Sequence, residues 1–176
     1  HNSAELRKNY LGIPADGLLD ESLSKDLIHG YYASVSYMDA MIGKLIEGLE
    51  EAGLREHTTI ILWSDHGYFL GEHGFWCKHS TFYEAVQIPL IISSPKYSSN
   101  DNSDSFTELV DIYPTLCELA GISPPDYLQG KSLTPVLKNP EIFLKDEIYT
   151  RYKQGEAVID KNFAYTEFIQ GNKYLG

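Results

Sequence analysis

The chain has 176 residues, of which 43% are hydrophobic and 12% aromatic, enough for a globular domain with a core. Its 14 Lys and Arg against 25 Asp and Glu leave a net charge of −11, which argues against a nucleic-acid partner because phosphate binding requires clustered cations. No apolar run approaches the roughly 18–20 residues of a membrane span, and two cysteines are too few for a disulfide-built scaffold.

The first predicted elements are a loop and a long helix. Residues 1–23 carry Gly, Pro and Asp at positions that break every period, which predicts a loop. Residues 24–52 carry apolar side chains at steps of three and four, which predicts an amphipathic helix. Ser24 is the predicted N-cap of this helix, and Gly53 is its predicted C-terminal stop.

Two short apolar runs follow the helix, at 58–63 and 88–93. The first is rich in β-branched residues and does not alternate, which predicts a strand buried on both faces of a parallel sheet. The second is predicted to be another buried strand. A loop rich in Gly, His and aromatic residues (64–80) separates them, and a polar loop (97–105) comes next.

The rest of the chain changes from helical to alternating patterns. Residues 110–120 predict a helix with Pro114 in its first turn. From Glu147 onward the chain shows short alternating runs, which predict an antiparallel meander. These runs are 148–150, 157–159 and 163–169. The order of elements predicts an α/β unit that ends in a small antiparallel subdomain.

Metal-binding chemistry is concentrated directly after the first predicted strand. Asp65 and His66 leave its carboxyl end, the edge at which open α/β sheets bind ligands. A carboxylate with an imidazole suits a divalent cation such as calcium, manganese or zinc. Two ligands are fewer than any of these ions requires, so other ligands must come from elsewhere. An Asp65 that caps a turn beside a hydrogen-bonded His66 is an equally good interpretation.

Further polar residues follow in the same loop. Lys78 comes thirteen residues after Asp65, and its ammonium can fold back to hold an anion as a point charge, although the pattern alone favours a surface lysine. Glu72 and His73 have the chemistry of an acid and a base, but we favour a role in tying down the loop. Cys77 is disfavoured as a nucleophile because that role requires a nearby base.

Taken in order, these motifs resemble the sulfatases of the alkaline-phosphatase superfamily, and most closely the iduronate-2-sulfatase-like members. The matching segments are 31–39, 42–43, 53–54, 58–61, 64–67, 70–74, Trp76, Lys78, 88–91, 110–116, 120–121, 130–133 and 165–168. The resemblance implies part of an alkaline-phosphatase-like sandwich, in which helices flank a mixed sheet. Residues 1–140 would be the C-terminal part of that α/β domain, and 141–176 the start of a small antiparallel subdomain.

The resemblance also implies roles for individual residues. Asp65 and His66 would be two protein ligands of the active-site cation, usually calcium, with manganese or zinc as alternatives. Lys78 would contact the sulfate group, and His73 and Trp76 would line or brace the pocket. Many sulfatases have Asn in place of His66, and the histidine fits the iduronate-type branch.

One part of the family pattern is missing. Sulfatases use a formylglycine made from Cys or Ser in a Cys/Ser-x-Pro/Ala-x-Arg motif, and neither Cys77 nor Cys117 lies in one. The nucleophile and two aspartate ligands are therefore expected upstream of His1, in the same polypeptide. The chain has no initiator Met, and its last alternating run lacks a partner before Gly176, so we expect it to be cut at both ends. By itself it is expected to be inactive and to bind metal weakly.

The function that the resemblance implies is hydrolysis of a sulfate ester on a sugar or glycosaminoglycan, in the periplasm or outside the cell, or alternatively in the lysosome. Tyr68, Phe69, Phe75 and Trp76 would form a sugar platform or, equally, a loop core. The nearest alternative is a phosphodiesterase or phosphonate monoester hydrolase of the same superfamily. An alternative of another class is a non-catalytic binding or structural module, which the intact pair and Lys78 disfavour.

Overall fold

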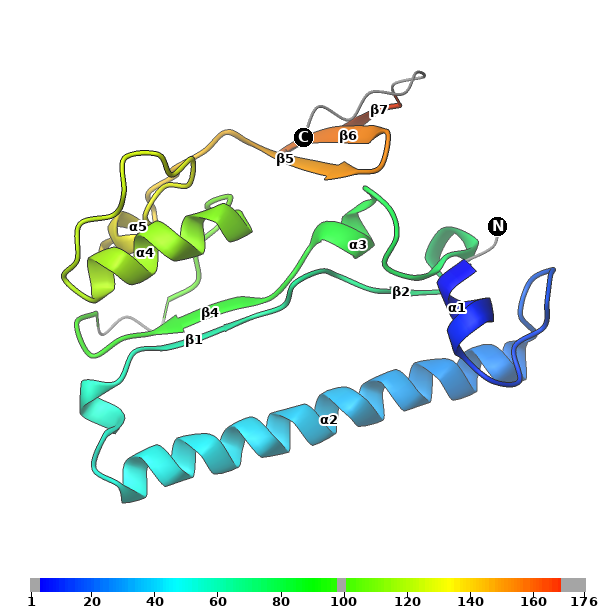
Figure 1. Cartoon of the computed structure of the whole chain (residues 1–176), viewed down its shortest axis with the longest axis horizontal. Helices are drawn as coiled ribbons and strands as arrows, with labels where there is room; N and C mark the ends of the chain where they lie inside the picture. Colours follow the sequence, from blue (N-terminus) through cyan, green and yellow to red (C-terminus); the bar gives the residue numbers. More distant parts are fainter. Residues whose placement is uncertain (1–3, 98–100, 169–176) are drawn as a thin grey trace. The chain divides into compact units, whose positions relative to one another are not determined.

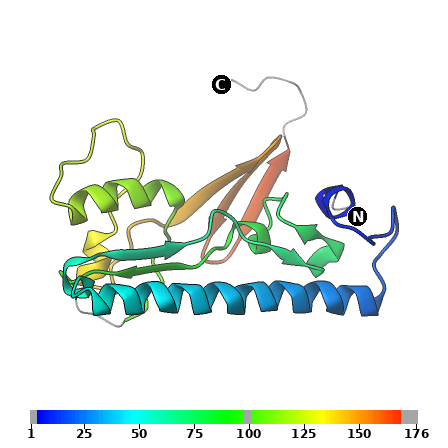
Figure 2. The ribbon, with the colours of Figure 1, turned by 60° about the horizontal axis from the view of Figure 1, so that its bottom comes forward.

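A computed structural model describes residues 4–97 and 101–168, and it divides the chain into two compact units. The first unit comprises residues 1–58 and 62–91, and the second comprises 59–61 and 92–176. Because this division runs through the middle of the chain, the boundary near residue 140 that the sequence suggested stays a prediction. Figure 1 and Figure 2 show the elements in chain order.

The first unit begins with a helix that the sequence did not predict. Its elements are α1 (Ala4–Asn9), α2 (Glu21–Glu51), η1 (Arg55–His57), β2 (Phe69–Leu70), η2 (Glu72–Gly74), β3 (Trp76–Cys77) and α3 (Tyr83–Val86). Within α1, Leu6 is buried, and the Arg7 guanidinium donates hydrogen bonds to the carbonyls of Pro14 and Gly17. The loop prediction for 1–23 was therefore wrong at α1, because six residues are too few to show a period and the helix depends on contacts with residues farther along.

The long helix α2 begins earlier than predicted and ends where expected. The Asp20 carboxylate accepts a hydrogen bond from the Leu23 backbone amide at 2.8 Å, so Asp20 and not Ser24 is the N-cap. Gly53 adopts φ +68°, and the Leu54 amide bonds to the Leu49 carbonyl at 2.9 Å, which confirms the predicted glycine stop.

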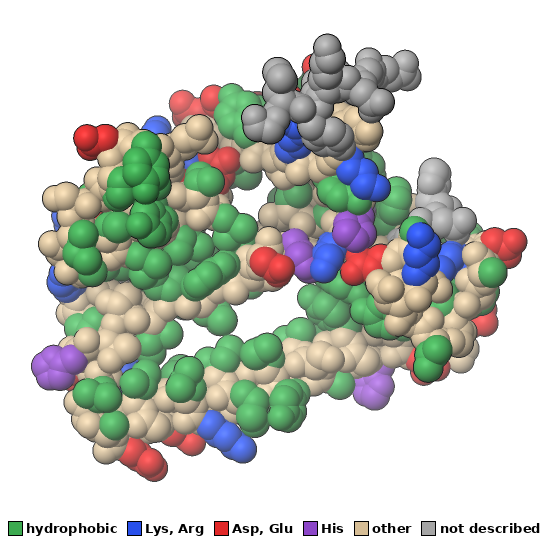
Figure 3. Space-filling view, in the orientation of Figure 1, with side chains coloured by type: hydrophobic (Ala, Val, Ile, Leu, Met, Phe, Trp, Pro, Cys, Tyr) green, Lys and Arg blue, Asp and Glu red, His purple; other side chains and the backbone are tan. Residues whose placement is uncertain are grey.

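The apolar stripe of α2 is not covered in the described chain. No residue of α2 is buried, and Figure 3 shows hydrophobic side chains along the visible face of the helix. Exposed large hydrophobic residues of α2 include Tyr32, Val35, Tyr37, Met38 and Leu45. The amphipathic pattern thus produced a helix, and nothing in residues 4–97 or 101–168 buries its apolar side.

Strands β1 (Ile60–Trp63) and β4 (Leu90–Ser93) are hydrogen-bonded neighbours. The chain runs through them in opposite directions (Figure 1), as a mixed sheet allows. A parallel return needs a crossover, usually a helix, and the only α-helix in the connection at 64–89 is the four-residue α3. Both strands are half-buried to exposed and not buried on both faces.

The second unit confirms the predicted helix and meander. Its elements are η3 (Leu109–Asp111), α4 (Ile112–Leu119), α5 (Thr134–Lys138), β5 (Glu147–Tyr152), β6 (Gly155–Asp160) and β7 (Ala164–Phe168). Pro114 lies in the first turn of α4, and β5, β6 and β7 form an antiparallel sheet in that order. Ile169 at the end of the predicted third run, and 98–100 in the predicted polar loop, lie outside the described residues.

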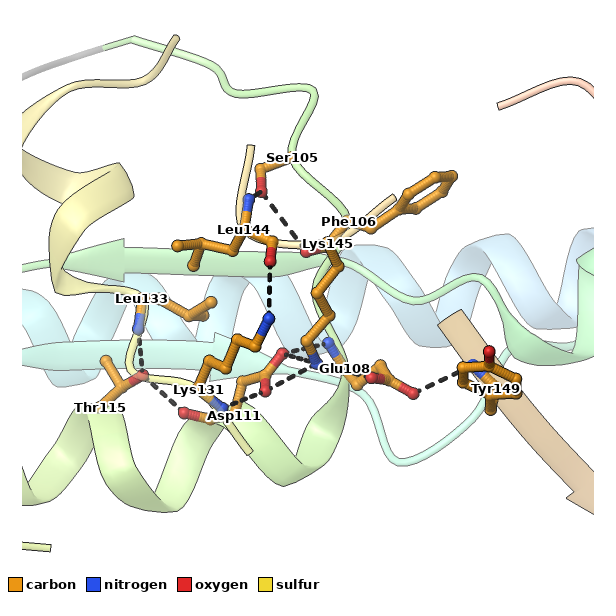
Figure 4. A network of polar contacts seen from close by, with 10 residues as sticks. All are labelled: Ser105, Phe106, Glu108, Asp111, Thr115, Lys131, Leu133, Leu144, Lys145 and Tyr149. Atoms are coloured by element: carbon orange, nitrogen blue, oxygen red, sulfur yellow. Dashed lines mark hydrogen bonds and ion pairs between the residues drawn. The ribbon is translucent and has the colours of Figure 1, made fainter. Parts of the chain in front are cut away.

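A buried polar network organises the start of α4 (Figure 4). Asp111 is completely buried and accepts backbone hydrogen bonds from Glu108 and Lys131, both at 2.8 Å. The Lys145 ammonium binds the Asp111 carboxylate at 2.7 Å and also pairs with Glu108. Burial lowers the pKa of Lys145, but its hydrogen bonds to Asp111 and Glu108 outweigh burial, so this pKa lies above its ordinary value.

Candidate metal and anion site

The predicted metal ligands lie in a tight turn directly after β1. The Ser64 hydroxyl donates to the His66 carbonyl at 2.7 Å, and the Gly67 amide donates to the Ala85 carbonyl at 2.8 Å. These bonds hold the turn against α3. The Asp65 carboxylate is 3.5 Å from Nε2 of His66 and is 83% exposed, so both ligand groups lie together and open to a ligand.

The hydrogen bond of His66 determines which ring nitrogen is available. Nδ1 lies 2.8 Å from the Gly67 carbonyl, which can only accept, so Nδ1 carries the proton. In the neutral imidazole, Nε2 then has a free lone pair on the side of the Asp65 carboxylate. One imidazole nitrogen beside carboxylate oxygens is a donor set that fits a divalent cation, and the backbone bond is of the kind that orients ligating histidines.

Two ligands are only part of a metal site. Among the described residues, no group of three or more His, Cys, Asp and Glu side chains could hold a metal ion. If Asp65 and His66 bind a cation, further ligands must therefore come from outside the described residues. Their roles as ligands stay a prediction.

Gly67 allows the turn to lie against the backbone of α3, and we expect its replacement to disrupt the site. A Cβ at this position would meet the Glu84 carbonyl oxygen at 2.1 Å and the Gln87 carbonyl oxygen at 2.7 Å. Because both obstacles are backbone atoms, Gly67→Ala should destabilise the chain by about 1–3 kcal/mol. Thermal unfolding and metal titration measure the two effects. Gly48→Ala in α2 is the control, since no atom lies within 4 Å of its added Cβ; equal behaviour of the two variants would contradict this account.

Lys78 lies in a cluster of charges that includes a residue of α1. Its ammonium is 3.7 Å from Oε1 of Glu5, and Nε2 of His79 is 2.8 Å from Oε2 of the same carboxylate. Neither Asp65 nor His66 forms a hydrogen bond or ion pair with Lys78 in the described part of the chain. Glu5 has no signal in the sequence beyond being an acidic residue in a segment that was predicted to be a loop.

His73 and Glu72 make contacts that brace the loop. His73 adopts φ +56°, its Nε2 lies 3.2 Å from Oε1 of Glu84, and its ring meets the Phe82 ring edge to face. The Glu72 carboxylate accepts a hydrogen bond from the Leu70 amide at 2.6 Å. These contacts support the interpretation that both residues tie down the loop.

Trp76 lies on the wall of a separate cavity of about 310 Å³. The other lining residues are Leu6, Arg7, Gly17, Leu18, Leu19, Ser24, Gly71 and Gly74. Gly71, with φ +114°, leaves room for the indole, because a Cβ there would lie 3.3 Å from it. Lys78 and His73 do not line this cavity, so the structure places Trp76 apart from the charged cluster.

Cys77 is packed into the loop core and is not poised as a nucleophile. Its side chain is completely buried, and the Tyr68 hydroxyl donates a hydrogen bond to its sulfur at 3.4 Å. Burial raises the pKa of the Cys77 thiol and outweighs the opposing effect of Tyr68 and Lys78. A protonated, enclosed thiol is unreactive, in agreement with the sequence analysis.

These features define an α/β protein with a candidate ligand pair, Asp65 and His66, directly after a strand. The family model described as Sulfatase matches residues 3–122, and the chain belongs to the sulfatase family. The family and the alkaline-phosphatase-like fold class that the sequence predicted are thereby confirmed.

Individual proteins show the same relationship. The chain is 41% identical over 110 residues to an N-acetylglucosamine-6-O-sulfatase of Bacteroides thetaiotaomicron, covering 62% of this chain and 20% of that protein. It is 31% identical over 134 residues to mouse (Mus musculus) iduronate 2-sulfatase, covering 62% and 24%. The chain spans between 20% and 30% of the length of the first curated relatives it matches.

Solved structures share the fold. A protein in complex with its substrate D-glucosamine-2-N,6-O-disulfate matches with a TM-score of 0.80 at 29% identity, covering 89% of this chain and 35% of that one. A phosphonate monoester hydrolase of Agrobacterium radiobacter matches with a TM-score of 0.74 at 25% identity, covering 78% and 32%.

Proposed function

We propose that the protein containing this chain is a sulfuric ester hydrolase that removes sulfate from a sulfated sugar. The observation that carries this proposal is the sulfatase-family segment in which Asp65, His66 and Lys78 are all present. Similarity to an N-acetylglucosamine-6-O-sulfatase and to a complex with a disulfated glucosamine supports a sugar, including one within a glycosaminoglycan.

Asp65 and His66 would hold the divalent cation, with calcium as our first choice and manganese or zinc as alternatives. A bound cation supplies positive charge against the oxygens of the sulfate group. Lys78 would bind a sulfate oxygen through charge-assisted hydrogen bonds. His73 and Trp76 would brace the loop that carries Lys78.

The remaining active-site groups would come from another part of the same polypeptide. We propose that a formylglycine nucleophile and two aspartate ligands lie there, since no Cys of this chain is in the required motif. The exposed apolar side of α2 would pack against that part, because covering it removes large hydrophobic surfaces from water.

We propose a periplasmic or secreted location, with the lysosome as the alternative, from the kind of substrate the family handles. The structure adds one finding: in the described residues no helix has both the length and the apolar character required to cross a membrane.

The proposed activity is tested by comparing sulfate and phosphonate monoesters as substrates of the whole protein. We expect hydrolysis of an aryl sulfate and of a 6-O-sulfated glucosamine, loss of that activity with a chelator, and recovery with calcium. The 176-residue chain alone should hydrolyse neither compound. Preferential hydrolysis of a phosphonate monoester would instead support the alternative enzyme, and no hydrolysis of any ester would support the non-catalytic module.

A further inference from the structure

We propose that Glu5 of α1 is a positioning residue for Lys78, holding the segment that carries the lysine so that its ammonium is ready for an anion. The inference rests on the proposed function in taking that anion to be the sulfate of the substrate. It adds a residue from a helix that contains none of the family motifs recognised in the sequence.

The two carboxylate oxygens of Glu5 lie at different distances from their partners, and this difference is consistent with a positioning role. One carboxylate oxygen lies 2.8 Å from Nε2 of His79, and the other lies 3.7 Å from Nζ of Lys78. The shorter contact joins α1 to the residue next to Lys78, as an ion pair when His79 is protonated. The longer one exceeds hydrogen-bonding distance, so it orients the ammonium through charge and leaves its three N–H donors for another acceptor.

Both sides of this contact are anchored. On α1, Leu6 beside Glu5 is buried, and Arg7 is bonded to the carbonyls of Pro14 and Gly17. On the other side, Cys77 next to Lys78 is completely buried and pairs with Phe69 across the β2–β3 ladder. Glu5 therefore links two segments that each have further contacts of their own.

Partial burial strengthens the attraction between the Glu5 carboxylate and the Lys78 ammonium. The Glu5 side chain is only 20% exposed and that of Lys78 is 34% exposed, so solvent screens their attraction less than it would on an open surface. In Figure 3, histidine, basic and acidic side chains gather in one area beside α1 and α3. Lysine has a flexible four-carbon stem, so restricting it before an anion arrives reduces the entropy lost on binding.

A double-mutant cycle with Lys78 in the whole protein tests the inference. Glu5→Ala should raise both KM for the sulfate ester and the inhibition constant of inorganic sulfate by about tenfold, with kcat changed by less than about threefold. In a Lys78→Met background the same substitution should change these constants by less than about twofold, because the residue acts through Lys78. Glu21→Ala is the control, since Glu21 is also a helical glutamate paired with a lysine, but 83% exposed.

The outcomes separate this inference from the proposed function. An equal effect of Glu5→Ala in both backgrounds would show a merely structural role, and tighter sulfate binding would show that Glu5 only repels the anion; either overturns the inference. If Glu5→Ala does not fold, Glu5→Gln keeps the size and an acceptor for His79, and the same cycle should show a smaller change in the same direction. Calorimetric titration with inorganic sulfate needs no turnover, so a protein that binds sulfate but hydrolyses no ester contradicts only the proposed function. A protein that binds no sulfate overturns the inference.

Discussion

Replacing Asp65 by Ala should lower kcat/KM for a sulfate ester by at least about 10³-fold. In the proposed site Asp65 is one of two ligands supplied by this chain, and a bound cation contributes several kcal/mol of charge stabilisation. A loss of about 4 kcal/mol corresponds to about three powers of ten in rate. Steady-state kinetics of the whole protein with added calcium measures the effect.

The Asp65 side chain is exposed, so a loss of activity in Asp65→Ala can be distinguished from a loss of stability. Its one recorded contact is with His66, so Asp65→Ala should change the free energy of unfolding by no more than about 0.5 kcal/mol. Asp26→Ala removes an exposed carboxylate from α2 and should leave both activity and metal binding unchanged. Full activity in Asp65→Ala would show that this carboxylate does not hold the cation.

The second large effect is expected on stability, from Asp111→Ala. The substitution leaves the Lys145 ammonium, whose side chain is 10% exposed, with only one of its two carboxylate partners, and it removes the acceptor for two backbone amides. Breaking a buried ion pair from one side costs about 3–5 kcal/mol. We expect a loss of that size in the free energy of unfolding, measured by chemical denaturation. Asp126→Ala serves as the control, because Asp126 belongs to the same unit and its side chain is exposed. A loss below about 1 kcal/mol would contradict the role assigned to the network.

The same pair predicts a dependence of stability on alkaline pH. Because the pKa of Lys145 is raised in the folded chain, its contribution is fully present below the ordinary lysine pKa of about 10.4 and is lost as pH rises through the folded value. The unfolding free energy of the unmodified chain should therefore fall more steeply above about pH 10.4 than that of Lys145→Met. Parallel curves for the two would rule out this linkage.

Local patterns in the sequence were sufficient for the elements whose stability is local. The three- and four-residue steps determined α2, Gly53 determined its end, and alternation determined the β5–β6–β7 meander. Asp65 and His66 could be located because a β-branched run directly precedes them. Each of these features depends on neighbours a few residues away, which a single sequence displays.

The tertiary structure alone decided the features that join distant segments. Helix α1, the opposite direction of β1 and β4, and the buried pair of Asp111 with Lys145 all depend on contacts between residues far apart in the chain. The same is true of Glu5, whose partners lie more than seventy residues away. The periodicity of a sequence does not reveal such contacts, because their partners are distant in the sequence and become neighbours only when the chain folds. The sequence by itself thus identified the family and a candidate pair of metal ligands, and only the fold placed Glu5 beside Lys78.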